Sequence, residues 1–110
     1  MTTISTHVLD TSLGKPAAGI DVRLFQPDGI VISSGVTNAD GRVASLVPDG
    51  TSIERGDYRL TFAIGSYFMA SGRQAFYPTV TIDFTVGDTT QHYHVPLLLS
   101  PFGYSTYRGS

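Results

Sequence analysis

The sequence predicts an all-β domain, an antiparallel sandwich or barrel built from short strands. Apolar and polar residues alternate with a period of two in several segments, as in strands with one buried face. Asp-Gly pairs, which favour tight turns, separate these segments. With 110 residues the chain is too short for a second hydrophobic core. We therefore expect one domain over residues 1–110.

The first elements illustrate the pattern. A strand near the N-terminus carries His7, and residues 20–25 form the next strand, with three apolar side chains facing one way. These are Ile20, Val22 and Leu24. The turn residues Asp28 and Gly29 follow, so we expect a hairpin that joins this strand to an adjacent one. Further turns are predicted at Asp40-Gly41 and Asp49-Gly50.

Two further alternating segments flank a short helix. In residues 58–64 and 80–86 every second residue is apolar and is expected to face inward. The inward residues are Tyr58, Leu60, Phe62 and Ile64 in the first segment, and Val80, Ile82, Phe84 and Val86 in the second. Between them, Ser66 is a favourable N-cap and Gly72 suits the position after a helix end. These signals predict a surface helix of about two turns.

The C-terminal stretch from Val95 to Tyr107 is apolar and almost free of charge. A strand with apolar residues on both faces is either deeply buried or covered by another subunit. In so small a domain we favour a subunit interface. The last four residues, Tyr107–Ser110, would ordinarily fray, but the apolar run that leads to them indicates that they are tied down.

Charge and composition exclude several classes of function. The formal net charge is -2, without a basic run, so nothing indicates a nucleic-acid or membrane partner. The absence of cysteine excludes disulfides, thiolate zinc sites and cysteine nucleophiles. Residues 1–10 lack the features of a signal peptide, and no segment has the ~20 apolar residues of a membrane span. We expect a cytoplasmic protein.

Three histidines are the candidates for proton transfer. His92 and His94 point to the same face of a strand, about 6.6–7 Å apart, and His7 lies on another strand. Histidine is well matched to acid–base work near neutral pH, although a single strand histidine is more often structural. The three could also form an open zinc site. That signal is weak, because the spacing arises easily by chance and no acidic residue is placed to support the ligands.

Other catalytic signatures are absent or ambiguous. There is no Gly-x-Ser-x-Gly elbow and no glycine-rich phosphate loop. Arg42, directly after the Asp40-Gly41 turn, could bind an anion or a carbonyl group. Taken alone, a solvated hairpin arginine is the better interpretation. The residues by themselves thus indicate a β domain with strand histidines and do not name a substrate.

Four parts of the chain resemble the 5-hydroxyisourate hydrolases of the transthyretin-related family. They are Ser5–Asp10 followed by Gly14–Ala17, Thr37–Arg42, Tyr77–Val80, and His92–Pro101 with the terminal Tyr104–Ser110. The resemblance covers essentially the whole chain, and only residues 49–56 are too generic to help. The terminal Tyr-Arg-Gly-Ser is the feature that separates these hydrolases from transthyretin, their hormone-carrying relative.

The resemblance implies a transthyretin-like, two-sheet antiparallel sandwich of about eight strands with one short helix. It also implies a homotetramer, a dimer of dimers, with active sites between the dimers. The implied reaction is the hydrolytic ring opening of 5-hydroxyisourate to 2-oxo-4-hydroxy-4-carboxy-5-ureidoimidazoline in urate degradation. Neither a metal nor another cofactor is implied.

The resemblance also implies the site residues. The catalytic set is His7, Arg42, His94 and Ser110, and the substrate contacts are His7, Arg42, Tyr107, Arg108 and Gly109. His92 is assigned a supporting or structural role. One of His7 and His94 would take the proton from water, and the other would orient the water or protonate the leaving nitrogen. Three alternatives stay open: a transthyretin-like carrier of small ligands without catalysis, a zinc hydrolase built on the three histidines, and a purely structural interaction domain, which only the resemblance places last.

Overall fold

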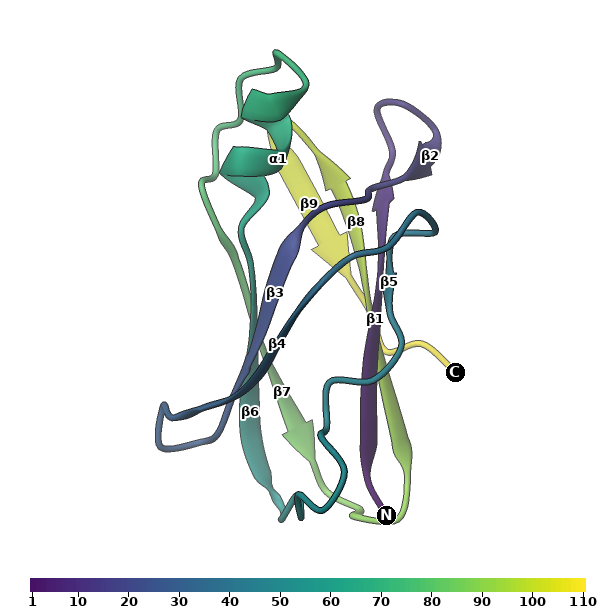
Figure 1. Cartoon of the computed structure of the whole chain (residues 1–110), viewed down its shortest axis with the longest axis vertical. Coiled ribbons are helices and arrows are strands. Elements are labelled where there is room, and N and C mark those ends of the chain that lie inside the picture. The colour runs from purple at the N-terminus through teal and green to yellow at the C-terminus, as the bar shows by residue number, and fades with distance from the viewer.

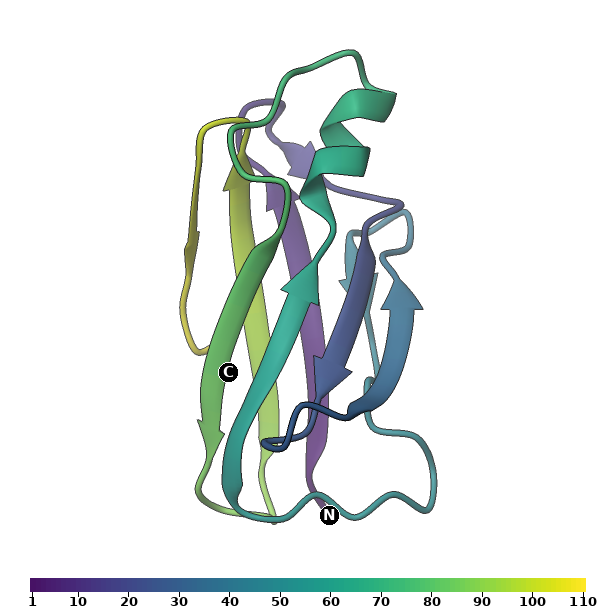
Figure 2. The ribbon, with the colours of Figure 1, turned by 90° about the vertical axis from the view of Figure 1, so that its left-hand side faces the viewer.

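The computed structural model describes residues 1–110 as two β-sheets packed face to face, with one short helix at one end (Figures 1 and 2). The first sheet contains β1 (Thr3–Asp10), β2 (Lys15–Pro16), β5 (Arg42–Val43), β8 (His92–Ser100) and β9 (Gly103–Thr106). The second contains β4 (Val31–Val36), β3 (Asp21–Phe25), β6 (Gly56–Phe62) and β7 (Val80–Val86). The predicted all-β sandwich with one helix is confirmed.

The core lies between the sheets and follows the predicted alternation. It contains 21 buried apolar residues from both sheets and from the helix. Of the side chains expected to face inward, only Phe84 is not buried. Phe84 lies at the rim of the core, where its ring packs against that of Tyr58 at a centroid distance of 6.4 Å. The strand period therefore predicted the buried face correctly, because successive side chains of a strand point to opposite sides.

The hairpin predicted at Asp28-Gly29 is confirmed. It connects β3 and β4, which pair antiparallel, and Gln26 N–H donates to the carbonyl of Ile30 at 2.8 Å. Gly29 has a φ of 91°, a conformation that glycine adopts without steric cost.

One strand pair departs from the antiparallel expectation. β1 and β8 are parallel, in a register that runs from Thr3 opposite His92 to Asp10 opposite Leu99. All other named pairs are antiparallel. Alternation reports which face is buried and carries no information on strand direction. The exception matters because this pair brings the two ends of the chain together.

The helix α1 (Ile64–Ala70) begins two residues before the predicted N-cap, Ser66. Its N-cap is Ala63, which has no side-chain cap hydrogen bond, so burial of Ile64 and Phe68 decides where the helix starts. The end agrees with the prediction. Gly72 has a φ of 71°, and the N–H groups of Gly72 and Arg73 donate to the carbonyls of Met69 and Phe68, which is a Schellman motif. With seven residues, this helix is not one that could cross a membrane.

The apolar C-terminal stretch divides between the core and the surface. Val95, Leu97 and Leu99 on β8 are buried within the chain. Four aromatic residues remain exposed, and three of their rings pack edge to face, Phe76 on Tyr77 and Tyr77 on Tyr104. We call the four residues the aromatic edge patch. They are Phe76, Tyr77, Phe102 and Tyr104. Burial within one chain thus accounts for only part of this stretch, and the expectation of a subunit interface stays a prediction.

Candidate functional site

All the predicted histidines lie on the outer face of the first sheet. Ile4 and Val8 of β1 and Tyr93 and Val95 of β8 point into the core, so the residues between them point outward. We call this surface the histidine face. It consists of Thr3, Ser5, His7, Arg42, His92 and His94.

Strand register brings three predicted catalytic residues together on this face. His7 on β1 lies opposite Arg42 on β5, and Ser5 on β1 lies opposite His94 on β8. Residues directly opposite each other point to the same side of a sheet, within side-chain reach. Figure 1 shows β1 running between β5 and β8. His7, Arg42 and His94 therefore converge from three strands, although the sequence separates them widely.

A chain of hydrogen bonds links the two histidines of β8 through β1. Ser5 Oγ lies 2.9 Å from His92 Nε2 and 2.8 Å from His94 Nδ1. On its other side, His92 Nδ1 bonds to Thr3 Oγ1. The two imidazole rings are nearly parallel, at 17°, with centroids 6.3 Å apart. Sequence reasoning missed Ser5 and Thr3, because their role depends on the parallel pairing of β1 with β8.

The environment of His94 favours a neutral imidazole. Burial lowers the pKa of His94 below its ordinary value of 6.5, and the nearby charge of Arg42 and the other two histidines lower it further. A neutral imidazole has one nitrogen that accepts a proton and one that donates. His94 is therefore suited to the work of a general base near neutral pH.

The C-terminal tail is tied to the same strand by one residue. Gly109 N–H donates to the carbonyl of His94 at 2.9 Å. A Cβ on Gly109 would come within 2.5 Å of His94 Cδ2, so only glycine fits this approach without displacing the imidazole. Ser110 follows as an exposed residue. The structure thus brings Gly109 to the edge of the site, and Ser110 lies next to it in the chain.

Tyr107 and Arg108 lie on another side of the tail. The Arg108 guanidinium stacks over the ring of Tyr93 at 4.6 Å and donates to Gln91 Oε1 at 2.7 Å. Both residues line a cavity of about 320 Å³ between the tail and β7, and His94 also contributes to its wall. Tyr107 remains largely exposed. The single chain therefore does not bring these two side chains to His7 and Arg42.

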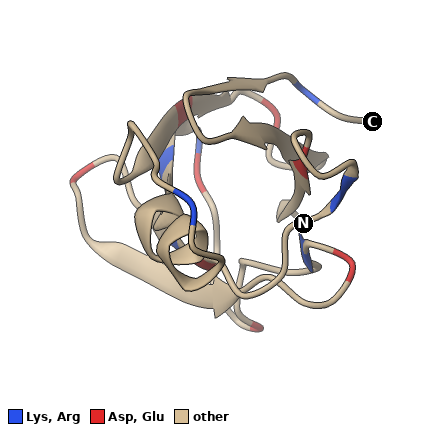
Figure 3. Cartoon of the chain, turned by 90° about the horizontal axis from the view of Figure 1, so that it is seen from above, with Lys and Arg blue, Asp and Glu red and all other residues tan.

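A larger hollow lies away from the histidines. It has a volume of about 570 Å³, lies over β6 and β7 of the second sheet, and is lined by Arg59, Asp83, Thr85 and other mostly polar residues. Arg59 and Asp83 pair across it at 2.7 Å. It contains no histidine, and we do not assign it to the candidate site. Figure 3 shows that positions with basic and acidic residues are interspersed along the ribbon.

The zinc alternative finds no support in the arrangement of side chains. No group of three or more His, Cys, Asp or Glu residues lies close enough to hold a metal ion. A catalytic zinc site requires three protein ligands that point at one position. His92 Nε2 and His94 Nδ1 are instead hydrogen-bonded to Ser5 Oγ.

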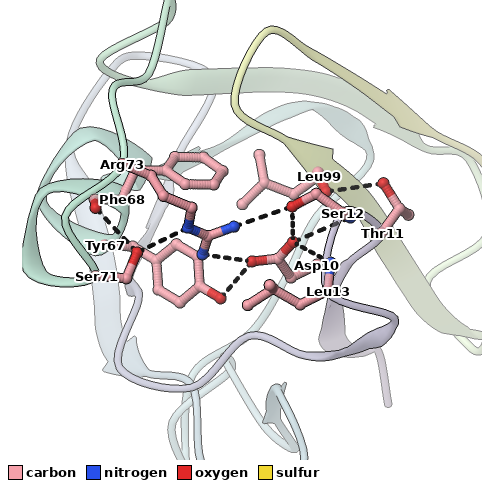
Figure 4. A network of polar contacts seen from close by, with 9 residues as sticks. All are labelled: Asp10, Thr11, Ser12, Leu13, Tyr67, Phe68, Ser71, Arg73 and Leu99. Carbon is pink, nitrogen blue, oxygen red and sulfur yellow. Dashed lines mark hydrogen bonds and ion pairs between the residues drawn. The ribbon is translucent and has the colours of Figure 1, made fainter.

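A second polar cluster lies at the end of β1, where Asp10 is fully buried (Figure 4). Tyr67 O–H donates to Asp10 Oδ2 at 2.7 Å, and Arg73 does so at 2.8 Å. Ser12 donates to the other carboxylate oxygen at 2.6 Å. Burial raises the pKa of Asp10, but the hydrogen bonds from Arg73, Ser12 and Tyr67 outweigh it, and the pKa lies well below its usual value. Through Tyr67 and Arg73, these hydrogen bonds hold α1 and the residues that follow it against the end of β1.

Comparisons with known proteins agree with this architecture. The model of the HIUase/Transthyretin family matches residues 4–109. A 5-hydroxyisourate hydrolase of Caulobacter vibrioides is 50% identical, and the alignment covers 100% of both chains. The solved structure of Klebsiella pneumoniae 5-hydroxyisourate hydrolase has a TM-score of 0.87 and 42% identity, over 98% of this chain and 99% of that one. Sea bream transthyretin in complex with thyroxine has a TM-score of 0.88 and 30% identity, over 96% of this chain and 93% of that one.

Proposed function

The chain belongs to the HIUase/Transthyretin family, and we propose that it is a hydrolase that opens the ring of 5-hydroxyisourate with water. The observation that carries the proposal is the convergence of His7, Arg42 and His94 on one face. The high identity to proteins named 5-hydroxyisourate hydrolase supports the same substrate. The product is 2-oxo-4-hydroxy-4-carboxy-5-ureidoimidazoline, and the reaction belongs to urate degradation.

The first step is the attack of water on a ring carbonyl. Neutral water is a poor nucleophile, and a positioned base contributes about 10²–10⁴-fold to such a step. His94 is the better candidate for the base, because burial and nearby Arg42 lower its pKa and keep its imidazole neutral. His7, half-buried on the neighbouring strand, orients the water or the leaving nitrogen.

Arg42 and the tail complete the site. The carbonyl oxygen becomes negative as water attacks, and a guanidinium aimed at it contributes several kcal/mol in a dry site. Arg42 lies opposite His7 and is exposed, so it can reach a bound substrate. Gly109 and Ser110 close the site from the tail. Tyr107 and Arg108, which one chain does not bring to His7 and Arg42, would contact the substrate only within an assembly.

We further propose a homotetramer, a dimer of dimers, with the sites between dimers, in the cytoplasm. The histidine face is open on the single chain, and a half-buried Leu9–Leu98 pair adjoins it on β1 and β8. A second copy that covers His7, Arg42 and His94, and leaves His92 at the start of β8 open to solvent, would exclude bulk water from the reacting groups. The exposed aromatic edge patch at residues 76, 77, 102 and 104 gives a second apolar surface for association.

The alternative function is a carrier of small ligands without catalysis. The solved structure of sea bream transthyretin with thyroxine motivates it, because the folds are alike. The neutral His94 beside Arg42 favours the hydrolase, since a carrier has no need of a proton acceptor.

The decisive experiment adds the purified protein to freshly oxidised urate and follows the transient ultraviolet-absorbing intermediate. We expect its loss to be faster than spontaneous decay, and we expect His94→Asn to lower kcat by about 10²–10⁴-fold. Circular dichroism and the mass of the assembly serve as controls for folding. Saturable binding of the intermediate without any acceleration would favour the carrier.

A further inference from the structure

We propose that His92 and Ser5 form a proton relay with His94, in which the exposed His92 holds the proton between water attack and cleavage of the carbon–nitrogen bond. The inference rests on the proposed function and gives His92 a task beyond the supporting role considered above. The observation behind it is the bridge in which Ser5 Oγ lies within hydrogen-bond distance of both imidazoles, at 2.9 and 2.8 Å.

The reason for a relay is the surroundings of His94. A base that accepts a proton from water becomes an imidazolium, and here that charge would lie in a half-buried site beside Arg42 and His7. Burial and these neighbours disfavour the charged form. His92, two residues away on the same face, is exposed to solvent. A positive charge costs less there, because water solvates it.

The hydrogen bonds can be ordered so that His94 starts as a base. His94 Nδ1–H donates to Ser5 Oγ, Ser5 O–H donates to His92 Nε2, and His92 Nδ1–H donates to Thr3 Oγ1. His94 Nε2 then carries the free lone pair. In this order Ser5 Oγ accepts from one imidazole and donates to the other, and His94 Nε2 is left to accept a proton from water.

The proton movement in the first step balances. When His94 Nε2 takes a proton from water, the Nδ1 proton of His94 passes to Ser5, and the hydroxyl proton of Ser5 passes to His92 Nε2. His94 is again neutral, with its proton on Nε2, and His92 carries the positive charge. No net charge has developed in the half-buried part of the site other than the oxyanion that faces Arg42.

The second step reverses these transfers. His94 Nε2 gives its proton to the leaving nitrogen, Ser5 returns a proton to His94 Nδ1, and His92 returns one to Ser5. The relay is restored. The second proton of the water stays on the new carboxyl group and is released when the product leaves, since a ureido nitrogen is not basic enough to take it.

The test measures kcat and KM for Ser5→Ala, His92→Gln and the double variant. We expect each single change to lower kcat by about tenfold or more at unchanged KM, near the lower end of what positioned proton transfer contributes. Because both changes break one relay, the double variant is expected to be no slower than the slower single variant. Thr81→Ala, which removes an exposed hydroxyl from β7 of the other sheet, is the matched control and should behave as the unmodified protein.

A second readout separates a relay from a structural role. In mixtures of H2O and D2O, kcat of the unmodified protein should depend on deuterium content along a curve, since several protons move together. In Ser5→Ala and in His92→Gln the dependence should become linear, because one proton remains in motion. Added imidazole should restore part of the activity of His92→Ala.

The outcomes distinguish the relay from the function on which it rests. If the unmodified protein does not accelerate ring opening, the proposed function fails. If it does, and His92→Gln retains full kcat or the two losses multiply in the double variant, the relay is wrong while the hydrolase assignment stands. His92 is exposed, so its substitution leaves the test valid even if Ser5→Ala fails to fold.

Discussion

A single residue type takes different roles on the histidine face according to its surroundings. His94 and His92 are two positions apart on one strand, and both bond to Ser5. Of the two, only His94 is partly buried and close to Arg42. Burial first, and then the charge of Arg42, lower the pKa of His94. The residue pattern alone made both candidates, and only the family resemblance assigned His94 to catalysis and His92 to a supporting role, because the burial and the charged neighbours of each histidine come from other strands. The surroundings of each histidine in the folded protein therefore set its proton affinity, and with it the role that the histidine can take.

The first prediction concerns the titration of His94. Its imidazole should be protonated with a midpoint below 6.5, the ordinary value for histidine, because burial and Arg42 disfavour the charged form. The neutral base consequently persists to lower pH than in an ordinary histidine, and activity falls once the pH drops through this lowered pKa. NMR titration of the ring protons measures the midpoint. In Arg42→Gln it should move upward, and a midpoint above 6.5 in the unmodified protein would contradict the assignment.

At the scale of elements, one buried ion pair fixes how α1 meets the sheet. Asp10 of β1 has no exposed side-chain surface and binds Arg73, just after α1. The pKa of Asp10 is depressed, so the folded state holds the carboxylate charged more readily than the unfolded chain does. The resulting stability is complete above pH 3.8, the ordinary value of Asp, and is lost as the pH falls through the depressed pKa.

The second prediction compares a buried and an exposed arginine. Arg73→Met should lower the free energy of unfolding by about 3–5 kcal/mol, because it leaves the buried Asp10 carboxylate without its ionic partner. Arg59→Met, which breaks an exposed pair with Asp83 of similar length, should destabilise the fold far less, because solvent screens that pair. Urea denaturation at neutral pH measures both. Equal losses in the two variants would show that the Asp10 network does not stabilise the fold as argued.

At the scale of the whole molecule, the single chain leaves two apolar surfaces at least partly uncovered. One is the aromatic edge patch at residues 76, 77, 102 and 104, and the other is the half-buried Leu9–Leu98 pair beside the histidine face. Contiguous exposed apolar surface on a small domain marks an interaction site. Association would cover both surfaces and would convert an open face into an enclosed cleft.

The third prediction is therefore about assembly. We expect sedimentation to give a mass near four times the 11.8 kDa of one chain. Leu98→Arg should dissociate the tetramer and lower activity at the same time. The new charge would lie in the proposed interface beside the histidine face, where its burial is unfavourable. Thr81→Arg, which adds the same charge to the other sheet, is the control for charge alone. Full activity in a monomeric Leu98→Arg variant would show that the active site does not require a second copy of the chain.

The sequence by itself determined the strand periodicity, the buried faces, the Asp-Gly turns and the glycine that ends α1, because these depend on local sterics and on which side chains avoid water. The resemblance added the family and the candidate residues. Only the tertiary structure decided the parallel pairing of β1 with β8, the start of α1 at Ile64, the buried Asp10 network and the bridge through Ser5. Each of these joins residues that are far apart in the chain or depends on packing against another element. Strand register and burial determine which side chains are hydrogen-bonded to each other, and neither can be deduced from a local sequence pattern.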